Sequence, residues 1–276
     1  MNVTPIEKQI QALNALVEGC SIRSTERMTD MHRDTIMRLM VRVGQQCQKT
    51  MDTLLRGFHC EHMEVDEIWS FVKKKERRLK PEEKALAVYG DQYVFVALDA
   101  DTKLVPAFTV GKRNGITTLA FLQQLQTKLK GNGRIQLTSD GFESYISAVE
   151  ETSGADIDYA MLIKIYGSVP ESEKRYSPPQ VTEVLSKIIN GMPDPKRICT
   201  SFVERQNLTM RMAMRRFTRL TNAFSKKLEN LKAAVALHFA HYNFMRVHST
   251  LRVTPAMEAK ITDHIWSFPE ILSWAG

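Results

Sequence analysis

The sequence lacks closely spaced cysteines and a long apolar segment. Its four cysteines, Cys20, Cys47, Cys60 and Cys199, are scattered, and no two form a C-x-x-C pair. No zinc ribbon is therefore predicted, and free thiols are typical of a reducing cytoplasm. No apolar stretch approaches the roughly 20 residues needed to span a bilayer, and no basic segment followed by an apolar one opens the chain. We expect a soluble, cytoplasmic protein with no membrane partner.

The composition is that of an ordinary globular protein with an excess of basic residues. Hydrophobic residues make up 43% and charged residues 25% of the 276 residues, which is typical of a chain that folds around a core. The length suits one large domain, or a small domain beside one of roughly 200 residues. A formal charge of +7 and a pI of about 9.2 favour a polyanionic partner without identifying it.

Residues 1–57 are predicted to be all-helical. Apolar residues recur at helical spacing from Ile6 to Val17, and further helices are expected at 21–28 and 32–43. Three short helices with a tight turn before the third form a helix-turn-helix arrangement. The alternative is a plain three-helix bundle with a solvated basic face.

The third of these helices carries basic residues away from its apolar face. They are Arg33, Arg38 and Arg42, and guanidinium groups are suited to the phosphates and base edges of DNA. We therefore predict that these three arginines bind DNA.

From residue 62 onward the pattern favours strands. The predicted strands are 63–72, 93–98, 103–110, 134–139 and 157–165, with one helix at 117–129 and another after 140–141. Pro106 lies inside the third strand, which places that strand at a sheet edge. Three strands, a helix, a strand, a helix and a strand is the order of a ribonuclease H-like domain. We expect residues 58–276 to form this α/β catalytic domain, with a mixed five-stranded sheet and flanking helices, preceded by the all-α helix-turn-helix domain.

Residues 166–197 are rich in glycine and proline. We expect a poorly packed insertion there with one short helix, 181–190. Long helices are predicted at 200–215 and 222–244. Thr254, followed by proline, is typical of a helix cap.

Three acidic residues lie where such a fold would gather metal ligands. Asp66 is in the middle of the first strand, Asp140 is at the end of the fourth, and Glu204 is one turn into the helix after the insertion. Divalent cations such as Mg²⁺ or Mn²⁺ prefer oxygen ligands. Two such ions can activate the attacking oxygen and stabilise the leaving oxygen in a displacement at phosphorus. We predict these three acids as metal ligands and catalytic residues.

Each of these acids has an alternative interpretation. Glu64 and Glu67 compete with Asp66, and strand alternation places Glu64 on the same face as Asp66 and Glu67 on the other. Asp140 alone is equally suited to cap a helix. Glu204 alone could be a surface acid in a basic helix.

The neighbours of Glu204 favour a functional stripe. At about 100° per residue, Asn207, Arg211 and Arg215 fall on the same side of the predicted helix as Glu204. A carboxylate, a carboxamide and two guanidinium groups suit a metal-bound phosphodiester. We predict that Asn207, Arg211 and Arg215 bind DNA; the alternative is a solvated ion-pair stripe.

Three segments resemble the catalytic blocks of bacterial insertion-sequence DDE transposases, in particular the group typified by the first insertion sequence described. They are 65–69 (VDEIW), 138–141 (TSDG) and 202–207 (FVERQN). The tail 242–251 (YNFMRVHSTL), followed by 254–256 (TPA), is similar to a tail found across several DDE transposase and integrase groups. Each block is weakly specific alone, and their order together makes the resemblance strong.

The resemblance implies that Asp66, Asp140 and Glu204 are the catalytic triad and that Asn207 accompanies the glutamate. It implies a transposase that binds terminal inverted repeats and target DNA, as a homo-oligomer on DNA. Such an enzyme cleaves phosphodiesters and joins 3′-hydroxyl ends by Mg²⁺ or Mn²⁺ catalysis. Two alternatives remain at this point: a structure-specific nuclease without strand transfer, and a helix-turn-helix transcription regulator whose larger domain senses or oligomerises.

Overall fold

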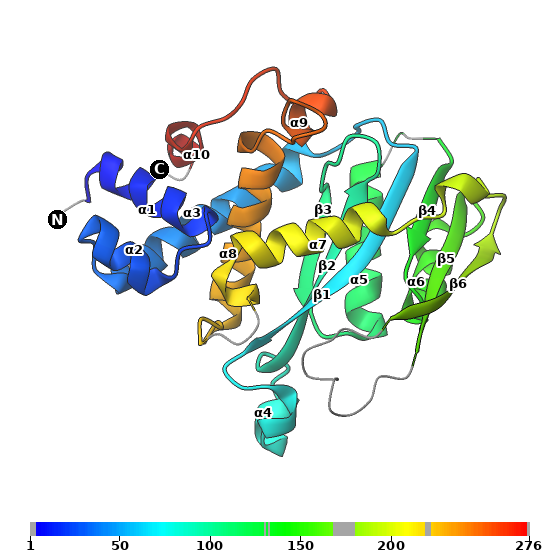
Figure 1. The fold of residues 1–276 in the computed structure, drawn as a ribbon, viewed down its shortest axis with the longest axis horizontal. Coiled ribbons are helices and arrows are strands. Elements are labelled where there is room, and N and C mark those ends of the chain that lie inside the picture. Colours follow the sequence, from blue (N-terminus) through cyan, green and yellow to red (C-terminus); the bar gives the residue numbers. More distant parts are fainter. Residues whose placement is uncertain (1–3, 130, 132, 168–179, 219–221, 275–276) are drawn as a thin grey trace.

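A mixed six-stranded sheet forms the centre of the fold (Figure 1). Its strands are β1 His62–Val72, β2 Gly90–Asp99, β3 Ala107–Gly111, β4 Ile135–Ser139, β5 Ile157–Tyr166 and β6 Val181–Asn190. Their order in the sheet is β3-β2-β1-β4-β5-β6. β1, β4 and β5 run parallel, whereas β2, β3 and β6 pair antiparallel with their neighbours. This computed structural model describes residues 4–129, 131, 133–167, 180–218 and 222–274.

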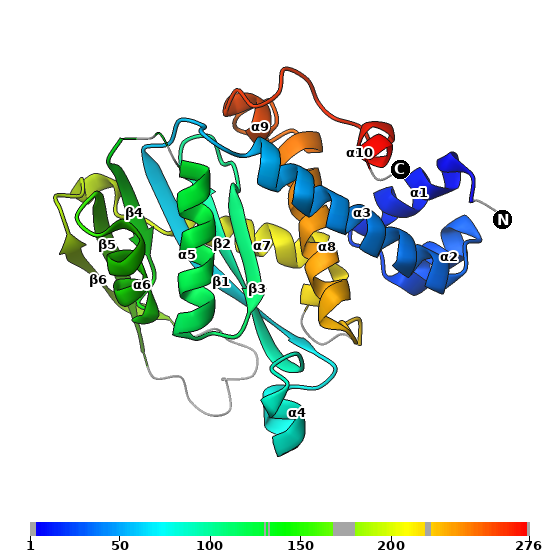
Figure 2. The same cartoon turned by 180° about the vertical axis from the view of Figure 1, so that it is seen from behind.

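Helices cover both faces of this sheet. α5 (Gly115–Leu129) and α6 (Ser144–Ser153) pack on one face (Figure 2). α7 (Ser201–Ala213) crosses the other face and contacts β1 and β2 (Figure 1). Every residue of β4 is buried, as expected of a strand with helices on both sides.

A group of helices lies beside the β3 edge of the sheet (Figures 1 and 2). They are α1 Ile6–Val17, α2 Ile22–Thr29, α3 Arg33–Leu54, α8 Leu228–Ala240 and α10 Phe268–Trp274. α3 packs along α8, and Phe239 of α8 contacts Phe108 of β3 with 4.7 Å between the ring centroids. The shorter elements are η1 Glu76–Arg78, α4 Pro81–Ala85, η2 Pro195–Arg197, η3 Arg215–Phe217, η4 His241–Met245 and α9 Pro255–Glu258.

The predicted order of strands and helices from β1 to β5 is confirmed. β3 is an edge strand, as Pro106 predicted, although the strand begins at Ala107, just after the proline. The predicted cap at Thr254 is also confirmed, because its hydroxyl accepts the backbone N–H of Met257 at 3.2 Å and Pro255 is the first residue of α9.

The helix predicted at 181–190 is wrong, because these residues form strand β6. The segment has the sequence VTEVLSKIIN, in which half of the residues are branched at Cβ and favour strands over helices. It pairs antiparallel with β5, so the sheet has six strands rather than five. Residues 168–179 of the predicted insertion lie outside the described residues.

Three helix boundaries also differ from the prediction. The third helix continues eleven residues beyond 43 to Leu54 because Cys47 and Met51 extend its apolar stripe. α7 ends at Ala213, so Arg215 lies in the 3₁₀ turn η3 rather than on the predicted helical stripe. α8 begins at Leu228 rather than at 222. Among the described residues, no helix has the length and apolarity required to cross a membrane.

The contact between α3 and α8 depends on Gly44. A Cβ atom at this position would overlap the backbone carbonyl of Ala233 in α8. Because the obstacle is backbone, a side chain cannot be accommodated by a change of rotamer. The two helices therefore approach closely only with glycine at this position.

Gly44→Ala is expected to lower the free energy of unfolding by about 2 kcal/mol, because the strain of overpacking exceeds the gain of up to about 1 kcal/mol in helix propensity. Gly115→Ala in α5 is the control, since a Cβ there meets nothing within 4 Å. Urea unfolding of both variants would measure the difference. Equal stabilities would show that α3 and α8 do not pack as described.

Candidate functional site

Two acids that are far apart in sequence meet between β1 and β4. The parallel pairing of these strands places Val65 beside Ser139, so Asp66 and Asp140 follow at the same level of the sheet. Carboxylate oxygens of Asp66, Glu67 and Asp140 all lie within 4.8 Å of one another. We call these three residues the carboxylate group.

The membership of Glu67 was not anticipated. Strand alternation predicts that Glu67 points away from Asp66, yet its carboxylate reaches the same place. The reason is that β4 ends at Ser139, so no neighbouring strand separates the two sheet faces beside Asp140. The side chain of Glu67 is only 2% exposed.

Arg113 bridges two members of the carboxylate group from the loop between β3 and α5. Its Nε lies 3.4 Å from Oε2 of Glu67, and its Nη2 lies 3.6 Å from Oδ2 of Asp140. The guanidinium also lies 4.0 Å from the centroid of the Phe142 ring, a cation–π arrangement that holds it in place. Sequence reasoning did not identify this arginine, and no local pattern marks it.

Burial and mutual repulsion raise the pKa values of the carboxylate group. Burial, followed by the charge of Asp140, raises the pKa of Asp66 to about 6. The same two causes raise the pKa of Glu67 to about 8, against the lowering effect of Arg113. Burial also raises the pKa of Asp140. Buried carboxyls that disfavour their own ionisation are typical of groups that share a cation or a proton.

Glu204 lies on α7 beside the carboxylate group but outside its 4.8 Å range. It forms an ion pair with Lys164 of β5, and Thr200 donates its hydroxyl to Oε1 at 2.6 Å. The charge of Glu204 raises the pKa values of both Asp66 and Asp140. The structure thus brings Asp66 and Asp140 into one group. Glu204 lies next to this group and is held there by its ion pair with Lys164 of β5.

Asn207 contacts Asp66 directly. This side chain is buried, and its Nδ2 donates to Oδ2 of Asp66 at 2.8 Å. Its Oδ1 is buried and has no hydrogen-bond partner among the described residues. A buried, unpartnered carbonyl oxygen beside a carboxylate leaves one acceptor available to a ligand in the site.

Glu64 has a structural role that the sequence did not indicate. Its Oε2 accepts the backbone N–H groups of Phe202 and Val203, both at 2.9 Å, and so caps the first turn of α7 from β1. The N-cap residue Thr200 does not cap this helix with its own side chain. Burial raises the pKa of Glu64 to about 7 although the two N–H donors oppose this. Glu64 is therefore a helix cap in this structure rather than a member of the carboxylate group.

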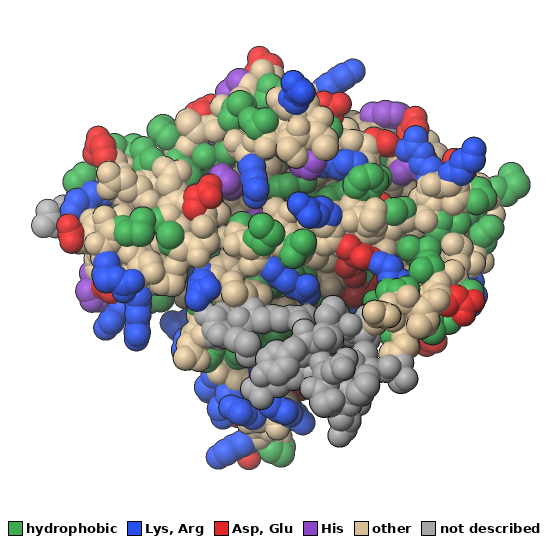
Figure 3. Space-filling view, viewed as in Figure 1, with side chains coloured by type: hydrophobic (Ala, Val, Ile, Leu, Met, Phe, Trp, Pro, Cys, Tyr) green, Lys and Arg blue, Asp and Glu red, His purple; other side chains and the backbone are tan. Residues whose placement is uncertain are grey.

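Acidic side chains gather below α7 on the face shown in Figure 3, and basic side chains flank them. Arg211 is in the last turn of α7 and Arg215 follows in η3, where its side chain is exposed. Arg33, Arg38 and Arg42 are exposed along the first half of α3, beside α1 and α2 and apart from the sheet (Figure 2). Of these three, Arg42 donates to the side chain of Gln9 at 2.9 Å.

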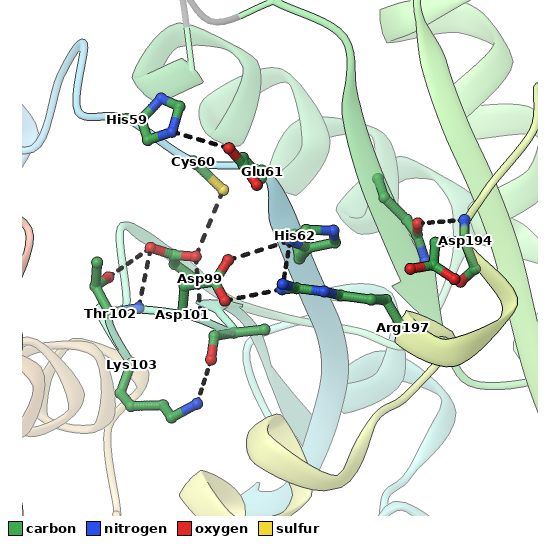
Figure 4. Close-up of polar contacts among 12 residues, drawn as sticks. His59, Cys60, Glu61, His62, Asp99, Asp101, Thr102, Lys103, Asp194 and Arg197 are labelled. Atoms are coloured by element: carbon green, nitrogen blue, oxygen red, sulfur yellow. Dashed lines mark hydrogen bonds and ion pairs between the residues drawn. The ribbon is translucent and has the colours of Figure 1, made fainter. Parts of the chain in front are cut away.

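A second polar cluster lies at the start of β1 (Figure 4). Glu61, His62 and Asp101 bring ligand atoms within 4.8 Å of one another. Arg197 contacts two of the three, because its Nη1 donates to Nδ1 of His62 at 2.8 Å and to Oδ1 of Asp101 at 2.9 Å. These contacts of Arg197 fasten the chain before α7 to the sheet.

The chain between β6 and α7 is also attached to β4. The backbone N–H of Asp194 donates to Oε1 of Gln136 at 2.8 Å, and Nε2 of Gln136 donates back to the Asp194 carbonyl at 3.2 Å. Gln136 belongs to β4. The segment between β6 and α7 is therefore attached to two different strands of the sheet.

Comparisons with models of protein families and with curated protein sequences found no match. Among solved structures, a piggyBac transposase synaptic complex with hairpin DNA is 13% identical, covers 99% of this chain and 71% of that chain, and gives a TM-score of 0.38. A Mos1 transposase paired-end complex with the left transposon end is 14% identical, covers 55% of this chain and 59% of that chain, and gives a TM-score of 0.22. Scores this low establish neither a shared fold nor a shared function.

Glu64→Ala is expected to lower the free energy of unfolding by about 2 kcal/mol, because two N–H groups at the start of α7 lose their acceptor. Glu64→Gln should lose less, since it keeps an oxygen acceptor and removes a buried charge. The control is Glu61→Ala, whose side chain is 62% exposed. Chemical unfolding would compare the three variants. A Glu64→Ala variant as stable as Glu61→Ala would contradict the capping role.

Proposed function

We propose that this chain is a DDE-type transposase of a bacterial insertion sequence. In this proposal it binds the inverted repeats at the element ends, cleaves phosphodiesters there and joins the freed 3′-hydroxyls to target DNA. The observation that carries the proposal is the close approach of Asp66 and Asp140, both partly buried, beside Glu204 and Asn207 of α7. A regulator that only binds DNA has no need for this costly arrangement of carboxyls.

The donor set fits Mg²⁺ or Mn²⁺. The carboxylate group offers three oxygen ligands within 4.8 Å, which is the chemistry that these cations prefer. Burial, followed by the charge of Asp140, raises the pKa of Asp66, and a nearby cation would oppose both effects. Asp66 and Asp140 of this group, with Glu204 beside them, are the proposed ligands, and such ions would supply charge stabilisation at the phosphorus and its oxygens.

The surrounding side chains prepare the acids for this role. Asn207 fixes the orientation of the Asp66 carboxylate, and we propose this positioning role for it in place of a direct contact with DNA. Lys164 pairs with Glu204, and Arg113 pairs with Glu67 and Asp140, so that part of the negative charge of the site is offset before DNA arrives.

DNA contacts are proposed for two separate surfaces. Arg211 and Arg215 follow the acids along α7 and η3 and would contact the phosphodiester backbone near the reaction. The exposed arginines of α3 would contact the element ends, with residues 1–57 acting as the helix-turn-helix domain. The strand order β3-β2-β1-β4-β5 supports a ribonuclease H-like assignment for residues 58–276.

The proposal is tested with the purified chain and linear DNA that carries the sequences flanking its own gene. Cleavage that requires Mg²⁺ or Mn²⁺ and disappears in Asp66→Asn and Asp140→Asn is expected. Joining of the cut 3′ ends to a second duplex distinguishes a transposase from a nuclease without strand transfer. Binding of the same DNA without any cleavage in either metal would refute the enzymatic function.

Glu204→Gln should impair cleavage, whereas Arg211→Ala should impair DNA binding. Glu204→Gln keeps the size of the side chain and removes its charge, so cleavage should fall by more than about 100-fold while DNA binding persists. Arg211→Ala should weaken binding to all sequences and retain cleavage at saturating protein. Cleavage assays and filter binding on the same DNA would separate the two effects. Near-normal cleavage by Glu204→Gln would remove Glu204 from the proposed site.

Replacing Arg33, Arg38 and Arg42 with alanine should weaken binding of element-end DNA. The slope of log affinity against log salt should also become shallower, by up to about 2.7 for three lost phosphate contacts. Titrations at several salt concentrations measure this slope.

A matched control removes the same number of positive charges elsewhere. Lys49, Arg56 and Lys260 are exposed, and their triple alanine variant should keep the slope of the unmodified chain. Equal changes in both triple variants would mean that net charge, rather than the first half of α3, determines binding.

A further inference from the structure

β6 is an edge strand with apolar residues exposed on both of its faces. Among the segments that the structure describes, it pairs only with β5. Val184 is 51% exposed, Leu185 is 44% exposed and Ile188 is 55% exposed. A long apolar edge strand with an open row of N–H and C=O groups is a template for one more strand. Soluble proteins usually cover or block such an edge, which makes its exposure informative.

A second copy of β6 fits this edge in one register. In antiparallel pairing about a two-fold axis, a strand meets itself and every contact occurs twice. If the axis passes through Leu185, each Glu183 lies opposite Lys187 of the second copy. Val184 then lies opposite Ser186, and Leu185 lies opposite Leu185. Directly opposed residues of opposite charge stabilise an antiparallel pair.

Neighbouring registers lack this match. An axis through Val184 places Glu183 opposite leucine and Lys187 opposite valine. An axis through Ser186 places Glu183 opposite isoleucine and Lys187 opposite leucine. Both alternatives leave each charge facing an apolar side chain, so the positions of Glu183 and Lys187 select the axis through Leu185.

We propose that β6 is a dimerisation strand, through which two copies of this chain join their sheets edge to edge. The register of β5 and β6 places Val184 beside Lys164, and Lys164 pairs with Glu204. The interface therefore lies one strand away from the candidate site in each copy. The dimer does not rest on the proposed function, because backbone pairing and charge complementarity drive it without DNA.

The test is a charge reversal with rescue, read by sedimentation equilibrium of the full chain without DNA. Glu183→Lys and Lys187→Glu each create two pairs of like charges, and each should weaken dimerisation by about tenfold or more. The double variant restores opposite charges and should dimerise like the unmodified chain. A mixture of the two single variants should form a heterodimer, although neither single variant dimerises well alone.

Matched controls carry the same change in net charge at exposed positions away from β6. Glu151→Lys in α6 and Lys49→Glu in α3 should leave dimerisation unchanged. An unmodified chain that stays monomeric throughout the accessible concentration range would overturn the proposal. Weakening by the single variants without rescue in the double variant or the mixture would overturn it as well. Circular dichroism confirms that each variant is folded.

Discussion

The two backbone bonds that Glu64 accepts from the first turn of α7 determine where the candidate site forms. Asn207 lies five residues after Phe202 in α7, which corresponds to roughly 7.5 Å along the helix axis. Asp66 lies two residues after Glu64 in β1, which corresponds to roughly 6.6 Å along the strand. The cap and the Asn207–Asp66 contact therefore fit together only when α7 follows the direction of β1. This constraint also places Glu204, which lies between the two contacts along α7, beside the carboxylate group.

The electrostatics of the site follow from this placement. Four carboxyls, those of Asp66, Glu67, Asp140 and Glu204, are gathered in one place. Burial is the largest cause of the raised pKa values of Asp66, Glu67 and Asp140, and the charges of neighbouring carboxylates add to it. Two cations, Arg113 and Lys164, come from a loop and from β5 and oppose the effect of these charges. Breaking one of these pairs would leave an uncompensated charge, which is far more costly in a buried place than at the surface.

Local pattern was sufficient for most of the fold but not for the contacts that complete the site. Alternating and apolar runs located β1 to β5, and the positions of Asp66 and Asp140 at a strand centre and a strand end predicted their meeting. The strand at 181–190 was missed because its flanking glycines and prolines suggested a loose insertion, and pairing with β5 overrode that signal. Three contacts of the site were missed because each joins residues that are distant in sequence. Glu67 meets Asp140 at the end of β4, and Glu64 caps the start of α7. Arg113 bridges two acids, Glu67 and Asp140.

The connection between β6 and α7 has a consequence for how the chain can vary. Asp194 is attached to Gln136 of β4, and Arg197 is attached to His62 and Asp101 at the start of β1 (Figure 4). These two attachments lie between the β6 edge and the first turn of α7. An insertion or deletion before Asp194 changes the length of the chain on the β6 side of these attachments and leaves the start of α7 in place. The outer hairpin can therefore diverge among related sequences while the register of Glu204 is preserved.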